Sequence, residues 1–342
     1  MEQSIKKKAK VYSRTRNRLI FYTIMLIWPV LQMAIFYVYV NFNSILLAFQ
    51  KYTENTNGIG YIITFDKHFE NFQVAWSRLI IDKLWMVGNS LKFYAIDYPT
   101  SIILCMSFSF YIYKKYPGSG VFKVFLYLPQ IISGLVLSII FKYLADYGYR
   151  EIVSLIHYGG DVIMDSKHIS QMVADGVYND GGLLYNENTA LITVIIFNIS
   201  FSFGSGMLLY SSTMSSIDES VVESCQLDGC NVFQEFWFIT LPLIFPTFKQ
   251  LFITSLCGLF TNQMSILSLY GENCPPDILR RICTLGYDIY LKTSVIGQLQ
   301  NQQYVSFSAG ELAAWGVILS VVMVPLIMWL RKVLTKFGPS VD

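Results

Sequence analysis

Apolar residues gather into six long runs along the chain, and segments richer in polar residues separate them. The runs cover about residues 19–40, 89–112, 121–142, 189–212, 243–264 and 312–334. Each can form a helix that crosses a bilayer, whose hydrocarbon core is about 30 Å thick and requires roughly 20 apolar residues. The second run is the least apolar, because Lys92, Asp97 and Pro99 interrupt it. The pattern predicts an all-α membrane protein with six transmembrane helices.

The composition supports a membrane environment. Of the 342 residues, 54% are hydrophobic and only 14% are charged, whereas a soluble domain has about 25% charged residues. The net charge is only +2, and the N-terminal tail is the one dense basic block. We therefore expect a lipid bilayer around the runs and no nucleic-acid partner.

Basic residues indicate the orientation of the chain. Seven Lys or Arg precede Leu19, and no small-residue cleavage site follows the first run, which favours a retained anchor. Further basic residues lie in short flanks, at Lys114, Lys115, Arg331, Lys332 and Lys336. Nine others are spread over the long segments 41–88, 143–188 and 265–311. The positive-inside bias then places both termini in the cytoplasm.

One segment expected on the cytoplasmic side departs from this bias. Residues 213–242, here called the acidic loop, contain five Asp or Glu and no Lys or Arg. Ser216 and Glu219 have the spacing of a capping box that opens a helix. Gly229 can adopt the positive φ of a turn, and Asn231 can cap a second short helix. We expect helix, turn and helix, with Pro242 at the end of the second helix.

The spacing within the acidic loop resembles the signature loop of ABC importer permeases, E-A-A-x-x-x-G, nine residues, then I-x-L-P. Gly229 follows Glu223 by six residues, and nine residues separate it from the Ile239–Pro242 tetrapeptide. The departures are two small residues in place of the alanines. Seven residues match the loop or replace its alanines, and the resemblance implies that they contact an ATPase. They are Glu223, Ser224, Cys225, Asp228, Gly229, Leu241 and Pro242.

Other short motifs resemble the maltose-type sugar permease branch of this family. They are Asn89-Ser90-Leu91, Leu128-Pro129 with Ile131-Ile132-Ser133, and the segment 308–314. The resemblance covers about residues 85–335 and implies a type I ABC importer permease fold. It implies a basic tail at 1–18, a first transmembrane helix and outer loop at 19–84, a transmembrane domain at 85–335 and a C-terminal tail at 336–342.

The resemblance also implies how such a subunit works. The acidic loop would form a coupling helix that docks in a groove of a cytoplasmic ATPase, where Glu223 would meet a basic residue and Gly229 would make the turn. An acidic surface without cations complements a basic groove. The chain itself would be non-catalytic and bind no cofactor, since ATP and Mg²⁺ belong to the ATPase subunits. The other implied partners are a second permease subunit in a heterodimer, an extracytoplasmic solute-binding protein and a sugar.

Neutral polar residues inside the fourth and fifth runs are the candidates for substrate contact. Polar side chains inside spans normally face the bundle interior, and hydroxyl and amide groups both donate and accept hydrogen bonds, as sugar hydroxyls require. Helical spacing places each set of three on one face. The sets are Asn198, Ser202 and Ser205, and Ser255, Leu259 and Asn262. Close helix packing is the alternative explanation for the serines.

Other candidate chemistry is sparse. Asp97 is the only carboxylate well inside a run, and an ion pair with a nearby lysine or a helix break at Pro99 explains it better than a substrate contact or a proton relay. The three histidines lie far apart and the six cysteines lack metal-ligand spacing, so we predict no catalytic or metal site. Cys274 and Cys283 can pair if their loop is extracytoplasmic, whereas Cys225 and Cys230 flank the turn for no evident reason.

Alternative functions remain open at this point. A self-contained secondary transporter would carry repeated charged residues in its spans. A membrane enzyme would have a cluster of His or acidic residues. The sequence has neither pattern. No nucleotide-binding motif occurs. Within importers, a polyol, glycerol phosphate or peptide is an alternative to a sugar. A phosphate would require Lys or Arg along the path, and the fourth run has none.

Overall fold

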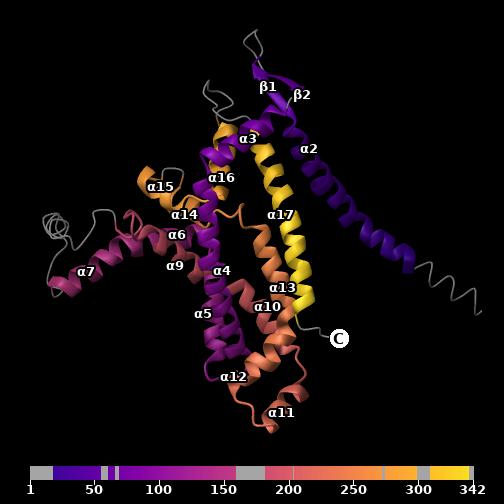
Figure 1. The fold of residues 1–342 in the computed structure, drawn as a ribbon. Helices are drawn as coiled ribbons and strands as arrows, with labels where there is room; N and C mark the ends of the chain where they lie inside the picture. Colours follow the sequence, from indigo (N-terminus) through magenta and orange to yellow (C-terminus); the bar gives the residue numbers. More distant parts are fainter. Residues whose placement is uncertain are drawn as a thin grey trace, which may run out of the picture. The chain divides into compact units, whose positions relative to one another are not determined.

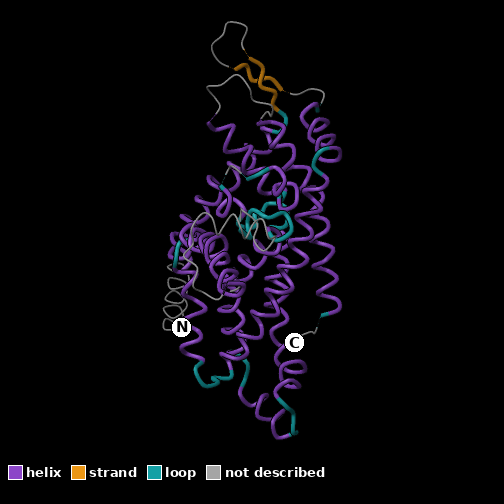
Figure 2. Tube along the Cα trace, turned by 90° about the vertical axis from the view of Figure 1, so that its left-hand side faces the viewer, coloured by secondary structure: helices purple, strands orange, loops and turns teal. Residues whose placement is uncertain are grey.

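The computed structural model describes residues 18–54, 61–65, 69–158, 182–202, 204–271, 274–298 and 309–338. Almost all of these residues are helical, which confirms the predicted fold class (Figure 2). Five helices are long and apolar enough to cross a membrane, and a bent pair of helices is the sixth candidate. The five are Arg18–Leu47, Leu84–Tyr113, Ala190–Ser215, Val232–Cys257 and Ala309–Lys336.

The chain divides into two compact units. The first, residues 1–77 and 302–318, contains the N-terminal helix, which ends in the π-helical η1 (Met33–Tyr39) and α2 (Val40–Leu47). A hairpin follows, in which β1 (Gln50–Glu54) pairs antiparallel with β2 (Tyr61–Phe65), and then α3 (Glu70–Ile81). The amide of Asn71 donates to the carbonyls of Ala48 and Gln50 and so fixes the start of the hairpin. The sequence did not predict this hairpin.

The second unit, residues 78–301 and 319–342, holds the remaining elements. Its first half contains α4 (Leu84–Tyr113), α5 (Ser119–Ile131), α6 (Gly134–Tyr143), the π-helical η2 (Leu144–Gly148) and α7 (Tyr149–Tyr158). Its second half contains α9 (Ala190–Ser202), α10 (Gly204–Ser215), α11 (Glu219–Leu227), α12 (Val232–Gln234), the π-helical η3 (Glu235–Thr240), α13 (Leu241–Cys257), α14 (Ile266–Tyr270), α15 (Pro276–Ile282) and α16 (Leu285–Gln298). The last helix, α17 (Ala309–Phe337), belongs to both units.

The third predicted span is not one helix. Ile132 and Ser133 are extended, with ψ of 140° and 132°, and the helix pair Ser119–Ile131 and Gly134–Val153 is bent by 100°. Pro129 lies one turn before the break, where its missing N–H removes a helical hydrogen bond. The prediction of one continuous helix at 121–142 is therefore wrong, while the bent pair as a whole remains the candidate for the sixth span.

The fifth predicted span is shifted. Its helix begins at Val232 rather than 243, ends at Cys257, and is continuous through Pro242. The π-helical η3 precedes Pro242, and in it the N–H of Leu241 reaches back five residues to Phe236. This wider turn accommodates the proline, so the expectation that Pro242 ends a helix is wrong.

Two apolar clusters form the core of the second unit. One joins α4, α9, α14 and α15 and includes Phe93, Phe197 and Ile282. The other joins α4, α10 and α13, which run side by side in Figure 1, and includes Phe110, Met207 and Ile244.

Two glycines let α10 approach its neighbours. A Cβ on Gly206 would lie 3.1 Å from the Cys105 sulfur of α4. A Cβ on Gly204 would lie 2.8 Å from the Gln130 amide and 3.0 Å from the Leu126 carbonyl of α5. The Gln130 side chain can move away, but the Leu126 carbonyl belongs to the backbone of α5, so this second contact has little freedom to relax.

We therefore expect Gly204→Ala to lower the thermal unfolding midpoint of the purified protein. Overpacking costs about 1–3 kcal/mol, which exceeds the gain of about 1 kcal/mol in helix propensity. The matched control is Gly88→Ala in α4, where nothing lies within 4 Å of the added Cβ; it should leave the midpoint unchanged or raise it. Equal midpoints for the two variants would show that the α5–α10 approach is not tight.

Candidate functional site

The first helix of the acidic loop begins at a different residue from the one predicted. Asp218 is the N-cap of α11, and its carboxylate accepts hydrogen bonds from the Ser220 N–H (3.1 Å) and hydroxyl (3.0 Å). These bonds, from the backbone first, lower the pKa of Asp218. The Ser216 hydroxyl instead donates to the Thr213 carbonyl. The predicted Ser216–Glu219 capping box is therefore wrong, because a carboxylate directly before the helix is the better partner for its N-terminus.

The turn after α11 matches the prediction. Gly229 has φ of +83°, a conformation that favours glycine. The Cys230 N–H donates to the Cys225 carbonyl at 3.0 Å, and a disulfide joins the same two residues. The two cysteines that had no explanation in the sequence therefore close the turn around Gly229.

The second helix begins as predicted at Asn231. The Asn231 side chain accepts from the Gln234 N–H at 2.9 Å, and the Gln234 side chain accepts from the Asn231 N–H at 2.8 Å. This reciprocal capping box starts the long helix Val232–Cys257. The loop is therefore attached rigidly to one membrane span.

The surface of the acidic loop combines acidic and apolar side chains. Glu223, Ser224, Asp228 and Gly229 are exposed, and Cys225 is half-buried. Beside them Leu227 is 88% exposed and Phe233 77% exposed. In the part of the chain that the structure describes, no cation pairs with Glu223 or Asp228. Large exposed apolar side chains next to unpaired charges are typical of a surface that binds another protein.

A buried ion pair connects the acidic loop to α4. Glu235 is 2% exposed, and its Oε1 lies 2.5 Å from Nζ of Lys114, although the angles are not those of an aligned hydrogen bond. Next to it, the rings of Phe110 and Phe236 meet edge to face at 5.1 Å. Sequence reasoning missed this pair. The one sequence feature that indicates a buried ion pair here is Glu235 itself, a single acidic residue at the start of an apolar stretch.

Asn198, one of the candidate substrate residues, is buried and fully hydrogen-bonded. Its amide donates to the carbonyls of Val194 (2.9 Å) and Met264 (2.8 Å), and its oxygen accepts from the Ser265 hydroxyl (2.9 Å). Met264 and Ser265 have positive φ values of 49° and 57°, which are uncommon for such residues. Asn198 therefore holds the segment after α13 in a strained conformation.

The other candidate substrate residues do not form the expected set. Helix α13 ends at Cys257, so Ser255 and Asn262 do not share a helical face, which corrects the prediction. The Ser255 hydroxyl lies 2.7 Å from that of Tyr94, Leu259 is buried, and Asn262 is exposed with its side chain bonded to the Met264 N–H. The side chains of Ser202 and Ser205 lie outside the described residues.

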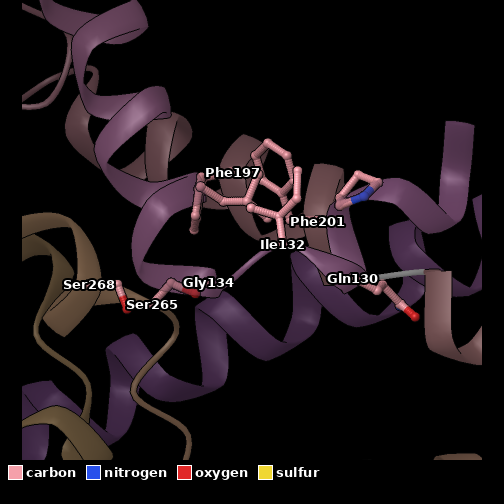
Figure 3. A pocket seen from close by; sticks show the side chains of 9 residues that line it. Gln130, Ile132, Gly134, Phe197, Phe201, Ser265 and Ser268 are labelled. Carbon is pink, nitrogen blue, oxygen red and sulfur yellow. The ribbon is translucent and has the colours of Figure 1, made fainter.

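A pocket of about 540 Å³ opens where the third span is broken. Figure 3 shows Phe197 and Phe201 near Ile132, with Ser265 and Ser268 coming from a separate segment. The lining residues are Pro129, Gln130, Ile132, Gly134, Leu137, Phe197, Phe201, Ser265 and Ser268. Hydroxyl, amide and aromatic groups line it, and none of these residues is charged. The sequence named none of them as a site residue, although Asn198 positions Ser265.

The remaining predicted features also have outcomes in the structure. Helix α4 is unbroken at Pro99, and no lysine of the described residues pairs with Asp97, so neither favoured explanation of Asp97 holds. Cys274 and Cys283 are free cysteines, so they do not pair. Among the described residues, no group of three or more His, Cys, Asp or Glu is arranged to hold a metal ion.

Residues 100–336 match the model of a protein family described as "Binding-protein-dependent transport system inner membrane component". The multiple sugar-binding transport system permease protein MsmF of Streptococcus mutans is 22% identical over 275 residues, 80% of this chain and 85% of that protein. The maltose/maltodextrin permease MalF of Salmonella typhimurium is 27% identical over 171 residues, 50% of this chain and 29% of that protein.

A solved structure has a similar fold. It is the crystal structure of a bacterial ABC transporter involved in the import of the acidic polysaccharide alginate. The TM-score is 0.62 with 16% sequence identity, and the alignment covers 96% of this chain and 99% of that chain. At this identity the likeness concerns the fold alone.

We expect Glu235→Gln to lower the unfolding midpoint, because Lys114 would keep its charge in a half-buried site without its partner. Breaking such a pair from one side costs up to about 3 kcal/mol. The double variant Glu235→Leu with Lys114→Met should recover most of the loss, since it removes both charges. Thermal unfolding of the wild type, the single variants Glu235→Leu and Lys114→Met and the double variant measures the coupling, and strictly additive effects would show that the pair does not interact.

Proposed function

Because the chain belongs to the family of binding-protein-dependent transport system inner membrane components, we propose that it is the permease subunit of an ATP-driven importer for an uncharged carbohydrate. Members of this family are non-catalytic multi-pass proteins of the cytoplasmic membrane that bind no cofactor and act in a complex with a solute-binding protein and partner subunits. We propose that residues 85–335 form the translocation path with a second permease subunit, with both termini in the cytoplasm.

The neutral lining of the pocket is the observation that carries the choice of solute. Phe197 and Phe201 offer apolar faces, and Gln130, Ser265 and Ser268 offer groups that donate and accept hydrogen bonds. This combination suits a sugar, which has apolar C–H faces and many hydroxyls. The names of several relatives, including MsmF and MalF, refer to sugar transport and support the same choice. A polyol would fit the same groups, whereas glycerol phosphate would lack a cation among the pocket residues.

We propose that the acidic loop couples the chain to a separate ATPase. Glu223, Asp228 and the adjacent apolar side chains would dock in a groove of that subunit, and Gly229 would shape the contact. Since the second helix of the loop continues to Cys257, a displacement of the loop moves that span directly. The Lys114–Glu235 pair would carry the same displacement to α4.

Charge reversal tests the coupling. We expect Glu223→Lys to lower uptake and ATPase association at least about tenfold, because it replaces an attractive contact by a repulsive one worth 1.4 kcal/mol or more. The matched control is Asp277→Lys, an exposed acid at the start of α15 outside the loop. Both variants should fold as the wild type does. Normal association and uptake by Glu223→Lys would remove the acidic loop from the coupling role.

Reconstitution tests the function itself. The chain is co-purified with candidate ATPase, permease and solute-binding partners and placed in vesicles. We expect neutral oligosaccharides to stimulate ATP hydrolysis, acidic oligosaccharides to have no effect, and Phe201→Ala to reduce the uptake rate several-fold. Failure to associate with any ATPase would contradict the importer assignment. Stimulation by acidic oligosaccharides alone would contradict the neutral substrate.

A further inference from the structure

The middle of α4 presents polar side chains that neither the acidic loop nor the pocket uses. Tyr94, Asp97, Tyr98 and Ser101 have the spacing i, i+3, i+4, i+7 and therefore lie on one face of the helix. Ile96 and Ile103 point away from this face, with exposed fractions of 46% and 65%. The polar face is thus the one that is turned toward the rest of the second unit.

Five buried polar atoms at this place have no hydrogen-bond partner among the described residues. They are Oδ1 of Asp97, the hydroxyls of Tyr98 and Ser101 on α4, the hydroxyl of Tyr127 on α5 and that of Tyr210 on α10. Ser255 lies near the Tyr98 hydroxyl without normal hydrogen-bond geometry. Buried polar groups are nearly always paired in proteins, so a concentration of unpaired ones requires an explanation.

These groups lie close to one another across three helices. The Cys105 side chain, one turn beyond Ser101, packs in the same cluster of side chains as Tyr210 of α10, and Tyr127 of α5 packs against that cluster. Gly206 brings α10 against Cys105, and Gly204 brings α10 against α5. The unpaired atoms therefore form one cluster between α4, α5 and α10.

The cluster adjoins the pocket. Tyr127 precedes Gln130, which lines the pocket, by three residues, or about one turn of α5. The only lysines of α4, α5 and α10 are Lys92 and Lys123, and both are exposed. Next to the neutral pocket there is therefore a cluster of four hydroxyls and one carboxylate, and neither of these two lysines lies buried beside it.

We propose that Asp97, Tyr98, Ser101, Tyr127 and Tyr210 form a second binding site for an uncharged polyhydroxylated solute, next to the pocket on the transport path. The carboxylate accepts hydrogen bonds from neighbouring solute hydroxyls, and the phenol and serine hydroxyls donate or accept as the solute requires. The stacked rings of Tyr94 and Tyr98, 5.1 Å apart, supply an apolar face beside them. This site rests on the proposed function.

The site belongs to a different state of the transport cycle from the one described. In the described state helix packing covers the five atoms, and their hydrogen bonds are unmade. A state in which α4, α5 and α10 separate gains those bonds with the solute, so solute binding favours that state. In this proposal the unpaired hydroxyls stabilise the state in which the solute is bound between these helices.

Isosteric variants distinguish this role from simple packing. Tyr98→Phe with Tyr210→Phe removes two hydroxyls that have no partner in the described state, so the unfolding midpoint should stay the same or rise. In vesicles that contain the complete complex, we expect uptake of labelled maltotriose to fall about tenfold. Hydrolysis stimulated by the solute-binding protein should continue, so more ATP is hydrolysed per solute. Asp97→Asn, a second isosteric change, should act in the same direction.

The matched control is Tyr143→Phe, which removes the hydroxyl of an exposed tyrosine and should change neither uptake nor hydrolysis. Wild-type uptake in the same vesicles separates the two proposals, because a wild type that moves no neutral carbohydrate contradicts the proposed function itself. If the wild type transports and the double variant transports equally well, the second site is wrong. A lowered unfolding midpoint in the double variant would also overturn it, since the hydroxyls would then be structural.

Discussion

A backbone inside a bilayer must satisfy its own hydrogen bonds, and a regular helix does this completely. The pocket of this molecule lies where regular helices are interrupted. Irregular backbone at membrane depth is tolerated only where protein covers it or where it lines a cavity. Among the residues that the structure describes, such places include the break at Ile132 and Ser133 and the segment between Cys257 and Ile266. Both contribute to the same neutral pocket, through Ile132 and Ser265 (Figure 3).

Asn198 explains how the second irregular segment remains ordered. Its amide and carbonyl groups bond to Met264 and Ser265, the two residues held at positive φ. In the structure Asn198, for which substrate contact stays a prediction, supports Ser265, which lines the pocket. The two helix interruptions and the hydrogen bonds of Asn198 thus shape the pocket. The polar cluster between α4, α5 and α10 lies about one turn of α5 away from it.

The acidic loop lies at the other end of the helix that leads to the pocket. A turn closed by Gly229 and the Cys225–Cys230 disulfide leads into a helix that is continuous to Cys257, next to the second irregular segment. A movement of the loop would therefore be transmitted to the segment that lines the pocket. The Lys114–Glu235 ion pair also links this helix to the end of α4, the helix that contributes Asp97, Tyr98 and Ser101 to the polar cluster.

Sequence reasoning succeeded where the signal is local and failed where it depends on distant contacts. The apolar runs, the Gly229 turn and the Asn231 cap are encoded by neighbouring residues and were predicted. The break after Pro129 was not, because Pro99, Pro246 and Pro325 also lie inside helices and leave them unbroken. The partners Lys114 and Glu235 are far apart in sequence, and tyrosine hydroxyls within an apolar run do not disturb its pattern.

The central claim is that a neutral solute occupies the pocket at the two helix interruptions, and thiol labelling tests it most directly. Ser268→Cys places a thiol in the pocket lining, while burial raises the pKa of the native Cys283 thiol to about 12 and of Cys274 to about 11, which disfavours the thiolate that reacts with a maleimide. The measurement is the labelling rate of Ser268→Cys by a maleimide in the complete complex in vesicles, corrected for wild-type labelling. The account predicts that a transported neutral oligosaccharide slows this rate. An unchanged rate at saturating solute would contradict it.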